Sequence, residues 1–199
     1  MVHPTAIKSA LTSPQVLDEW ERHRRYLGMS AISQCARYLY DTYLDGRDDP
    51  SRRTLQYCHE GYLHEQDIVE RLEKAGYQVT HRGAELVADF DDRHRGHIDG
   101  YLPQADLLLE VKSVSQIRFD QVRREPFPSH VAQVQAYLHY SDFRRALIVY
   151  KSRNNGDLWT HIVHEDYQTG AMLEEKARRI LARIDAETPP PCTCGRCDA

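Results

Sequence analysis

The sequence lacks several features that would place the protein in a special class. None of its apolar runs approaches the roughly 18 residues of a membrane-spanning helix, so a membrane span is excluded. The N-terminal segment has no basic stretch followed by an apolar run, so we expect no secretory signal and predict a cytoplasmic protein. The P-loop motif G-x-x-x-x-G-K-[ST] is missing too, so we expect the protein to act alone or with a separate motor protein.

Positively charged residues are also fewer than negatively charged ones. Lysine and arginine total 26 against 30 acidic residues, and the net charge of −4 argues against binding polyanions through bulk charge. Arginines nonetheless gather locally, in groups at positions 22–25, 52–53, 93–95, 118–124 and 144–145. Such groups can hold phosphates, although for any single group a solvated helix face is the simpler interpretation.

The five cysteines are an odd number in a chain for which we expect no export. A disulfide framework is therefore not expected, and metal ligation and simple burial are the alternatives.

The pattern of apolar and turn residues predicts an α/β fold, a central mixed β-sheet flanked by helices. Helices are expected first, and strands then alternate with two further helices. The expected helices are 13–26, 30–46, 50–76, 129–141 and 167–186, and the expected strands are 77–81, 84–90, 96–102, 106–114, 145–152 and 158–165. The whole chain, 1–199, is expected to form a single domain, with an N-terminal helical segment 1–50, a core 51–165 and a C-terminal helix and tail 166–199.

Two charges interrupt an apolar strand in the segment GHIDGYLPQADLLLEVKSV. Glu110 and Lys112 are two residues apart, so their side chains project from one face of the strand. A buried charge costs several kcal/mol unless it is paired or bound to a metal. Asp99 lies eleven residues before Glu110, where a hairpin would bring the two carboxylates together. The spacing favours a Mg²⁺ or Mn²⁺ site, with a structural salt bridge as the alternative.

These residues resemble a known catalytic signature. Asp99 followed by Glu110-Val111-Lys112 is similar to the D…(E)xK motif of the PD-(D/E)XK nuclease superfamily. The helical segment GYLHE, residues 61–65, resembles the G-x-x-H element of its RecB/AddB-like exonuclease branch, and QVQAY, residues 133–137, resembles the Q-x-x-x-Y element of the same branch.

The resemblance implies a role for each matching residue. His64, Asp99 and Glu110 would bind the metal, with the Val111 carbonyl as a further ligand, and Lys112 would position or activate water. Gln133 and Tyr137 lie on one helical face and would contact the substrate phosphate or the lysine. Structural alternatives stay open: His64 as an ordinary surface or core residue, with His59 as a competing ligand, and Gln133 and Tyr137 as packing residues.

A second resemblance concerns the cysteines. Iron–sulfur nucleases of the AddB type and CRISPR-associated nucleases carry one cysteine before the nuclease core and three after it, and Cys35, Cys192, Cys194 and Cys197 match that arrangement. Four thiolates suit a [4Fe–4S] cluster or a zinc ion. The resemblance implies a [4Fe–4S] cluster, and zinc stays open as the alternative because the terminal C-x-C-x2-C group is tighter than the usual spacing. Cys58 is expected to be buried as a small apolar residue.

Together these features predict a metal-dependent DNA nuclease, an exonuclease that acts on DNA ends or single strands in recombination, repair, phage replication or CRISPR spacer processing. Its expected partners are DNA and a helicase or CRISPR adaptation protein. The alternatives are a catalytically inactive nucleic-acid-binding module with a structural metal site, and a structure-specific endonuclease or RNA-directed nuclease on the same fold.

Overall fold

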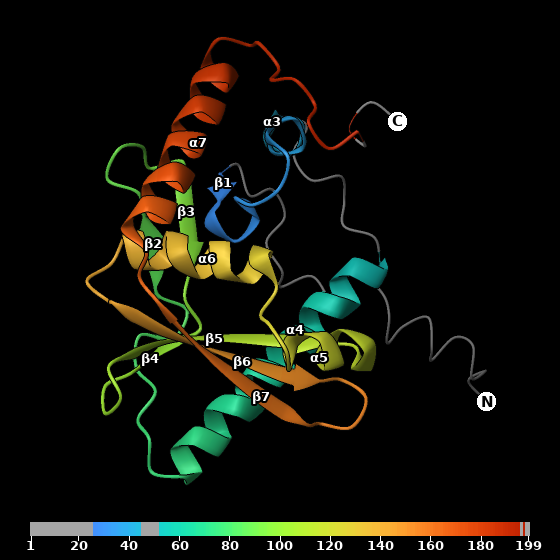
Figure 1. The fold of residues 1–199 in the computed structure, drawn as a ribbon, viewed down its shortest axis with the longest axis vertical. Coiled ribbons are helices and arrows are strands. Elements are labelled where there is room, and N and C mark those ends of the chain that lie inside the picture. The colour runs from blue at the N-terminus through green and yellow to red at the C-terminus, as the bar shows by residue number, and fades with distance from the viewer. Residues whose placement is uncertain (1–25, 45–51, 196, 198–199) are drawn as a thin grey trace, which may run out of the picture.

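The computed structural model describes residues 26–44, 52–195 and 197. Short N-terminal elements come first, then a long helix, a group of strands and a helix-rich C-terminal half (Figure 1). In chain order the elements are β1 (Leu27–Gly28), the 3₁₀ helix η1 (Met29–Ala31), α3 (Ala36–Leu44), α4 (Arg52–Lys74), β2 (Glu85–Val87), β3 (His94–His97), β4 (Gly100–Leu102), β5 (Leu107–Val114), α5 (Gln116–Val122), α6 (Pro128–His139), β6 (Arg145–Ser152), β7 (Leu158–His164) and α7 (Tyr167–Asp185). None of the helices in these ranges has the length and apolar character needed to cross a bilayer.

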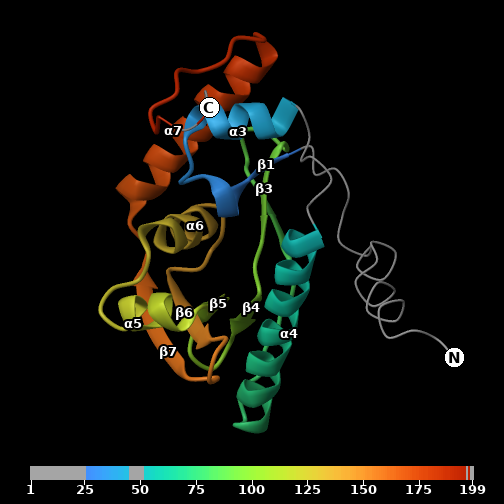
Figure 2. The same cartoon turned by 90° about the vertical axis from the view of Figure 1, so that its right-hand side faces the viewer.

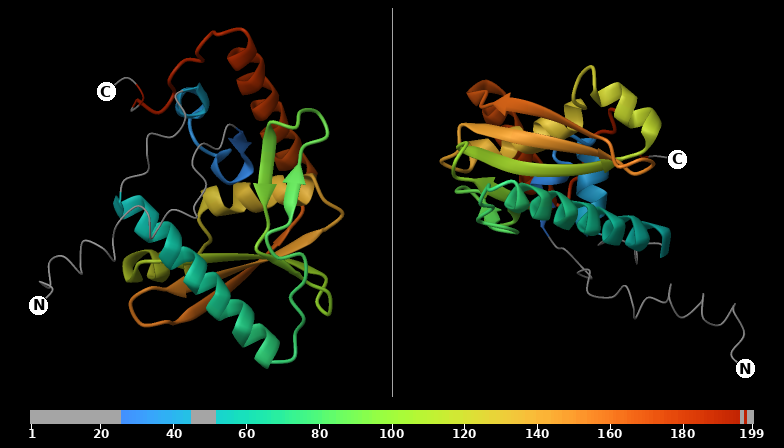
Figure 3. Two further views of the ribbon diagram at one scale, coloured as in Figure 1. Left: turned by 180° about the vertical axis from the view of Figure 1, so that it is seen from behind. Right: turned by 90° about the horizontal axis from the view of Figure 1, so that it is seen from below.

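A four-stranded sheet, in the order β4-β5-β6-β7, lies at the centre of one half of the molecule. Strands β5 and β6 pair in parallel, and β4 and β7 pair antiparallel with them at the two edges. Helix α4 covers one face of this sheet, where its Ile68 and Val69 pack on Leu109 and Val149, and α6 covers the other face (Figure 3). Burial on both faces explains why β5 begins as an unbroken leucine run.

The second half of the molecule contains a three-stranded sheet, in the order β1-β3-β2. It packs with η1, α3, α6 and α7 in the larger hydrophobic cluster. Figure 2 shows α3 and α7 at the end of the molecule away from the lower part of α4. His94 of β3 is fully buried, and its Nδ1 lies 2.8 Å from the carbonyl oxygen of Leu27, which ties β3 to β1.

The predicted α/β fold is confirmed, but the single central sheet is resolved into two sheets. The segment expected as one strand over 96–102 is divided between β3 and β4, with Ile98 and Asp99 between them. A Cβ on Gly100, the first residue of β4, would lie 2.7 Å from Val79 Cγ1, so a larger residue there would require Val79 to move. Because of this division, Asp99 lies at a bend between two strands and not within the hydrogen-bonded part of either strand.

Several element boundaries differ from the expected ones. The helix expected from residue 30 starts at Ala36, because η1 and the following turn bury Met29 and Ile32 in the core first. The strand expected over 77–81 forms only an isolated bridge between Thr80 and Tyr101. The short helix α5 was not expected, and the helix expected over 13–26 lies almost wholly outside the described residues.

Candidate active site

A cavity of about 600 Å³ lies between the two sheets. Its walls come from η1 and α3 on one side and from α4 on another, and its floor comes from β3, β5 and α6. Elements far apart in the sequence therefore meet there, and each contributes polar side chains. Asp99, Glu110, Val111, Lys112, Gln133 and Tyr137, all predicted site residues, line this one cavity.

Glu110 and Lys112 form an ion pair at the floor of the cavity. Lys112 Nζ lies 2.6 Å from Glu110 Oε1, as expected for side chains two residues apart on one strand. Glu110 is 2% exposed, whereas the Lys112 side chain is 24% exposed and reaches toward the opening. Burial lowers the pKa of Lys112, but the neighbouring Glu110 carboxylate more than offsets this, and the net pKa is raised. Lys112 is therefore a stable ammonium group next to the cavity.

Asp99 reaches the same cavity from the bend between β3 and β4. Its Oδ2 accepts a hydrogen bond of 2.6 Å from the backbone N–H of Val111, which holds Asp99 beside the middle of β5, next to Glu110. Strands β4 and β5 pair antiparallel with Gly100 opposite Leu109, the hairpin that the sequence predicted. Burial, followed by the charges of Glu110 and Glu65, raises the pKa of Asp99 well above its usual value.

Helix α4 contributes Glu65, not the predicted His64, to the cavity lining. Burial raises the pKa of Glu65, and Glu110 is close enough to raise it further, although Arg82 opposes the shift. His64 is absent from the lining. Burial, followed by the charge of Lys151, lowers the pKa of His64, and neither Asp99 nor Glu110 is among the charges that act on it.

Helical geometry accounts for the difference between these two neighbours. Gly61 lines the cavity, and on an α-helix the residue four positions later is turned by about 40° from it, whereas the residue three positions later is turned by about 60° in the opposite sense. Glu65 and His64 therefore diverge by about 100°. The GYLHE segment contained the relevant carboxylate, and the i, i+4 relation to Gly61 was the signal that could have identified it.

Gln133 and Tyr137 form the third side of the site, on the buried face of α6. The side-chain amide of Gln133 donates to Glu110 Oε1 at 2.8 Å and to the Tyr137 hydroxyl at 2.9 Å. Both residues are buried, and burial raises the pKa of Tyr137, so its hydroxyl stays protonated. The i, i+4 pair therefore fixes the orientation of the Glu110 carboxylate.

The charges of the cavity suit a divalent cation. Three carboxylates, Glu65, Asp99 and Glu110, line it, and Lys112 is in direct contact with one of them. Glu110 Oε2 is buried and has no hydrogen-bond partner among the residues that the structure describes. An unpartnered buried acceptor is costly, and Mg²⁺ and Mn²⁺ prefer such carboxylate oxygens. The residues present therefore fit a hard divalent ion, and Glu65, Asp99 and Glu110 are the groups that could hold it.

Comparison with known proteins bears on the fold. No protein-family model and no curated protein matches the chain. Among solved structures, LHK-Exo in complex with dAMP has a TM-score of 0.67 and 17% sequence identity, covering 85% of this chain and 93% of that one. Another structure of this alkaline exonuclease, from Laribacter hongkongensis, has a TM-score of 0.62 and 14% sequence identity, covering 88% of this chain and 94% of that one. A phage-related exonuclease from Haemophilus somnus has a TM-score of 0.62 and 13% sequence identity, covering 86% of this chain and 97% of that one.

This chain has the fold of these exonucleases. Each alignment covers at least 85% of this chain and at least 93% of the matched structure, so the likeness concerns the fold as a whole. At this level of identity the likeness concerns the fold, and the chemistry has to be argued from the residues of the cavity.

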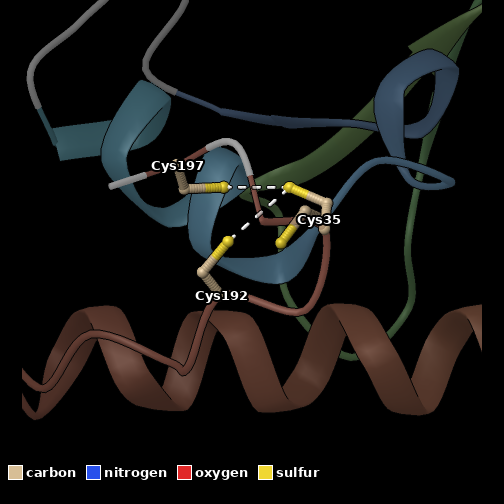
Figure 4. A group of neighbouring side chains, drawn as sticks. Cys35, Cys192 and Cys197 are labelled. Carbon is tan, nitrogen blue, oxygen red and sulfur yellow. Dashed lines mark hydrogen bonds between the residues drawn. The ribbon is translucent and has the colours of Figure 1, made fainter. Parts of the chain in front are cut away.

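The four cysteines singled out in the sequence meet in space, as predicted. Cys35 immediately precedes α3, and Cys192, Cys194 and Cys197 lie in the tail after α7 (Figure 4). Thr193 hydrogen bonds, the largest cause, lower the pKa of Cys35 to about 5. Cys58 is outside this group and is exposed on α4, so its predicted burial was wrong: its position falls on the solvent side of that helix.

Proposed function

We propose that this protein is a metal-dependent DNA nuclease, an exonuclease that acts on DNA ends or single strands. The observation that carries the proposal is the meeting of Glu65, Asp99, Glu110 and Lys112 in one cavity of an exonuclease-like fold. The matched LHK-Exo structure is described as a complex with dAMP, a nucleotide of the size of one excised unit. The cavity, of about 600 Å³, falls in the usual volume range of small-molecule sites.

Each cavity residue has a role in this proposal. Glu65, Asp99 and Glu110 hold Mg²⁺ or Mn²⁺, with the Val111 carbonyl as a further candidate ligand. The bound ion would supply Lewis-acid stabilisation of the charge that develops on the phosphate and would lower the pKa of a bound water. Lys112, the ammonium at the cavity floor, positions the attacking water and stabilises negative charge on the phosphate.

Gln133 acts through Glu110 and is a positioning residue. Its amide occupies one lone pair of Glu110 Oε1, so Oε2 is directed to the unpartnered position where a cation fits. Tyr137 in turn accepts from the same amide group and fixes its orientation. Preorganised groups of this kind reduce the reorganisation that the reaction requires.

The opposite wall of the cavity suits a nucleotide. Tyr26, Tyr38 and Tyr43 line the cavity, Arg95 of β3 lines its floor, and Tyr38 is 51% exposed. Stacking of a base on an aromatic side chain is worth about 1–3 kcal/mol and is tolerant of sequence. Arg95, which pairs with Glu85 and Asp92, would be the cationic group of the lining nearest to a bound phosphate only after release from these partners. A helicase or CRISPR adaptation partner, implied only by resemblance, stays a prediction.

The test is cleavage of end-labelled single-stranded and double-stranded DNA, with Mg²⁺, Mn²⁺ or EDTA. We expect stepwise shortening from an end in the presence of either ion, none in EDTA, and loss of at least about 100-fold in rate for Glu110→Gln and Lys112→Met. Internal cuts in closed circular DNA would instead identify an endonuclease. Metal-dependent activity that survives in both variants would contradict the assignment to this cavity.

A paired substitution on α4 distinguishes the two candidate ligands. Glu65→Gln should reduce cleavage strongly and raise the Mn²⁺ concentration needed for half-maximal rate, because a carboxylate ligand is lost. His64→Ala should leave both quantities within a few-fold of wild type. The opposite ranking would restore His64 as the ligand and would require a rotation of α4 relative to the structure.

A further inference from the structure

The cysteine group, Cys35, Cys192, Cys194 and Cys197, is spatially separate from the carboxylates. None of its members lines the cavity. All four sulfur atoms lie within 4.8 Å of one another, and the Cys192–Cys194 and Cys194–Cys197 separations are 3.6 and 3.3 Å. The distances between the sulfur atoms indicate whether the group can bind a single ion or a larger cluster.

Sulfur spacing distinguishes a single ion from a cluster. A tetrahedral zinc ion with bonds of about 2.3 Å places its four thiolates about 3.8 Å apart. A [4Fe–4S] cubane binds each thiolate at a different iron corner, so the thiolates lie about 6.4 Å apart. Every sulfur pair in the group is therefore closer than a cubane would allow, and the Cys192–Cys194 and Cys194–Cys197 separations lie within about 0.5 Å of the zinc value.

The group also joins two distant parts of the chain at one wall of the cavity. Cys35 is the residue before α3, and α3 contributes Tyr38, Leu39, Thr42 and Tyr43 to the lining. The tail returns from the end of α7 to reach it, and in Figure 4 the three labelled sulfur atoms point toward one another beside α3. A hydrogen bond of 3.7 Å between Cys35 Sγ and Thr193 Oγ1 also links the two segments at this junction.

We propose that these four cysteines bind one tetrahedral zinc ion, not the [4Fe–4S] cluster that the resemblance implied, and that this ion fixes α3 as the wall of the cavity. Closing a link between residues so far apart in sequence removes much of the chain's freedom when it is unfolded. The site is closed, with four protein ligands and no open position, which is typical of structural zinc. Its role is therefore to hold the wall.

Metal analysis tests the identity of the ion without reference to nuclease activity. The full-length protein is expressed in medium containing both iron and zinc and is purified anaerobically. We expect one zinc per chain, negligible iron and sulfide, and no absorption near about 400 nm. Replacement of the ion by Co²⁺ should give the intense visible bands of tetrahedral cobalt thiolate. Four irons with four sulfides per chain, a single iron, or no metal would each overturn the proposal.

Hydrogen exchange tests the role of the ion. Removal of zinc by a chelator should raise the exchange rate of amides in 36–44 at least about tenfold and leave those of β5 and β6 unchanged. Cys192→Ser should reproduce both the loss of zinc and the faster exchange. Cys58→Ser, which replaces the exposed cysteine outside the group, should change neither. Unchanged exchange in 36–44 after complete zinc removal would refute the structural role.

Discussion

Replacing Gly96 with alanine should destabilise the protein and slow DNA cleavage at the same time. A Cβ at this position would lie 2.5 Å from Tyr137 Cε1 and 3.0 Å from both Met29 Cβ and Met29 Sδ. Tyr137 and Met29 are fully buried, so neither can move away freely. Overpacking of this kind costs about 1–3 kcal/mol. In a domain of this length, each kcal/mol lowers the melting temperature by about 2–4 °C.

The catalytic effect should follow from displacement of the Tyr137 ring. Its hydroxyl accepts a hydrogen bond from Gln133, and Gln133 donates to the Glu110 carboxylate, so a shift of the ring is transmitted to a proposed metal ligand. We expect kcat to fall at least about tenfold, since misplacement by about 1 Å can cost up to about 100-fold. Thermal melting and single-turnover cleavage of end-labelled DNA measure the two effects.

Gly61→Ala is the matched control in the same cavity. Among the described residues, no atom beyond its chain neighbours and its own helix backbone lies within 4 Å of the Cβ that it would add, and the residue is in the interior of α4. Alanine in a helix is more stable than glycine by about 0.5–1 kcal/mol, so the melting temperature should rise by about 1–4 °C. A Gly96→Ala protein with wild-type melting and wild-type kcat would refute the packing argument, as would a Gly61→Ala protein destabilised as much as Gly96→Ala.

Two further substitutions have predicted outcomes. Burial, followed by the charges of Glu110 and Glu65, raises the pKa of Asp99, so Asp99 holds its proton more tightly in the folded state than in the unfolded state. The stability that protonated Asp99 contributes is therefore lost as the pH rises above the ordinary carboxyl range. Asp99→Asn should therefore raise the melting temperature of EDTA-treated protein at about pH 8 but not near pH 4, and should remove the gain that Mn²⁺ gives; a lower melting temperature at pH 8 would contradict this. Gly170→Ala, whose Cβ would lie 2.6 Å from His139 Nδ1, should cost about 1–3 kcal/mol in thermal melts while cleavage by the folded protein keeps its wild-type kcat; a large loss of kcat would show coupling to the cavity.

Alternation along one strand made the floor of the cavity predictable from sequence. The period of two placed Glu110 and Lys112 on one face, and the turn between 102 and 107 brought Asp99 beside them as an antiparallel hairpin requires. The helical period placed Gln133 and Tyr137, four residues apart, on one face of their helix. These relations are local, so they survive errors elsewhere in the predicted fold.

The remaining features depended on tertiary packing. The rotation of α4 about its axis decides between His64 and Glu65, and it is set by Ile68 and Val69 docking on the sheet rather than by the GYLHE segment itself. The expected sheet is divided in two at Ile98 and Asp99, where no local pattern in the sequence marks a break. The three tail cysteines are clustered in the sequence, and the resemblance to iron–sulfur nucleases added Cys35 to them, but the choice between one ion and a cluster needed interatomic distances.

Anomalous diffraction from crystals grown with Mn²⁺ tests the central claim most directly. We predict one strong manganese peak in the cavity, bonded at about 2.0–2.5 Å to oxygens of Glu65, Asp99 and Glu110, and lost in Glu110→Gln crystals. A peak bonded to His64 instead, or no peak in the cavity at a saturating concentration of Mn²⁺, would contradict the account.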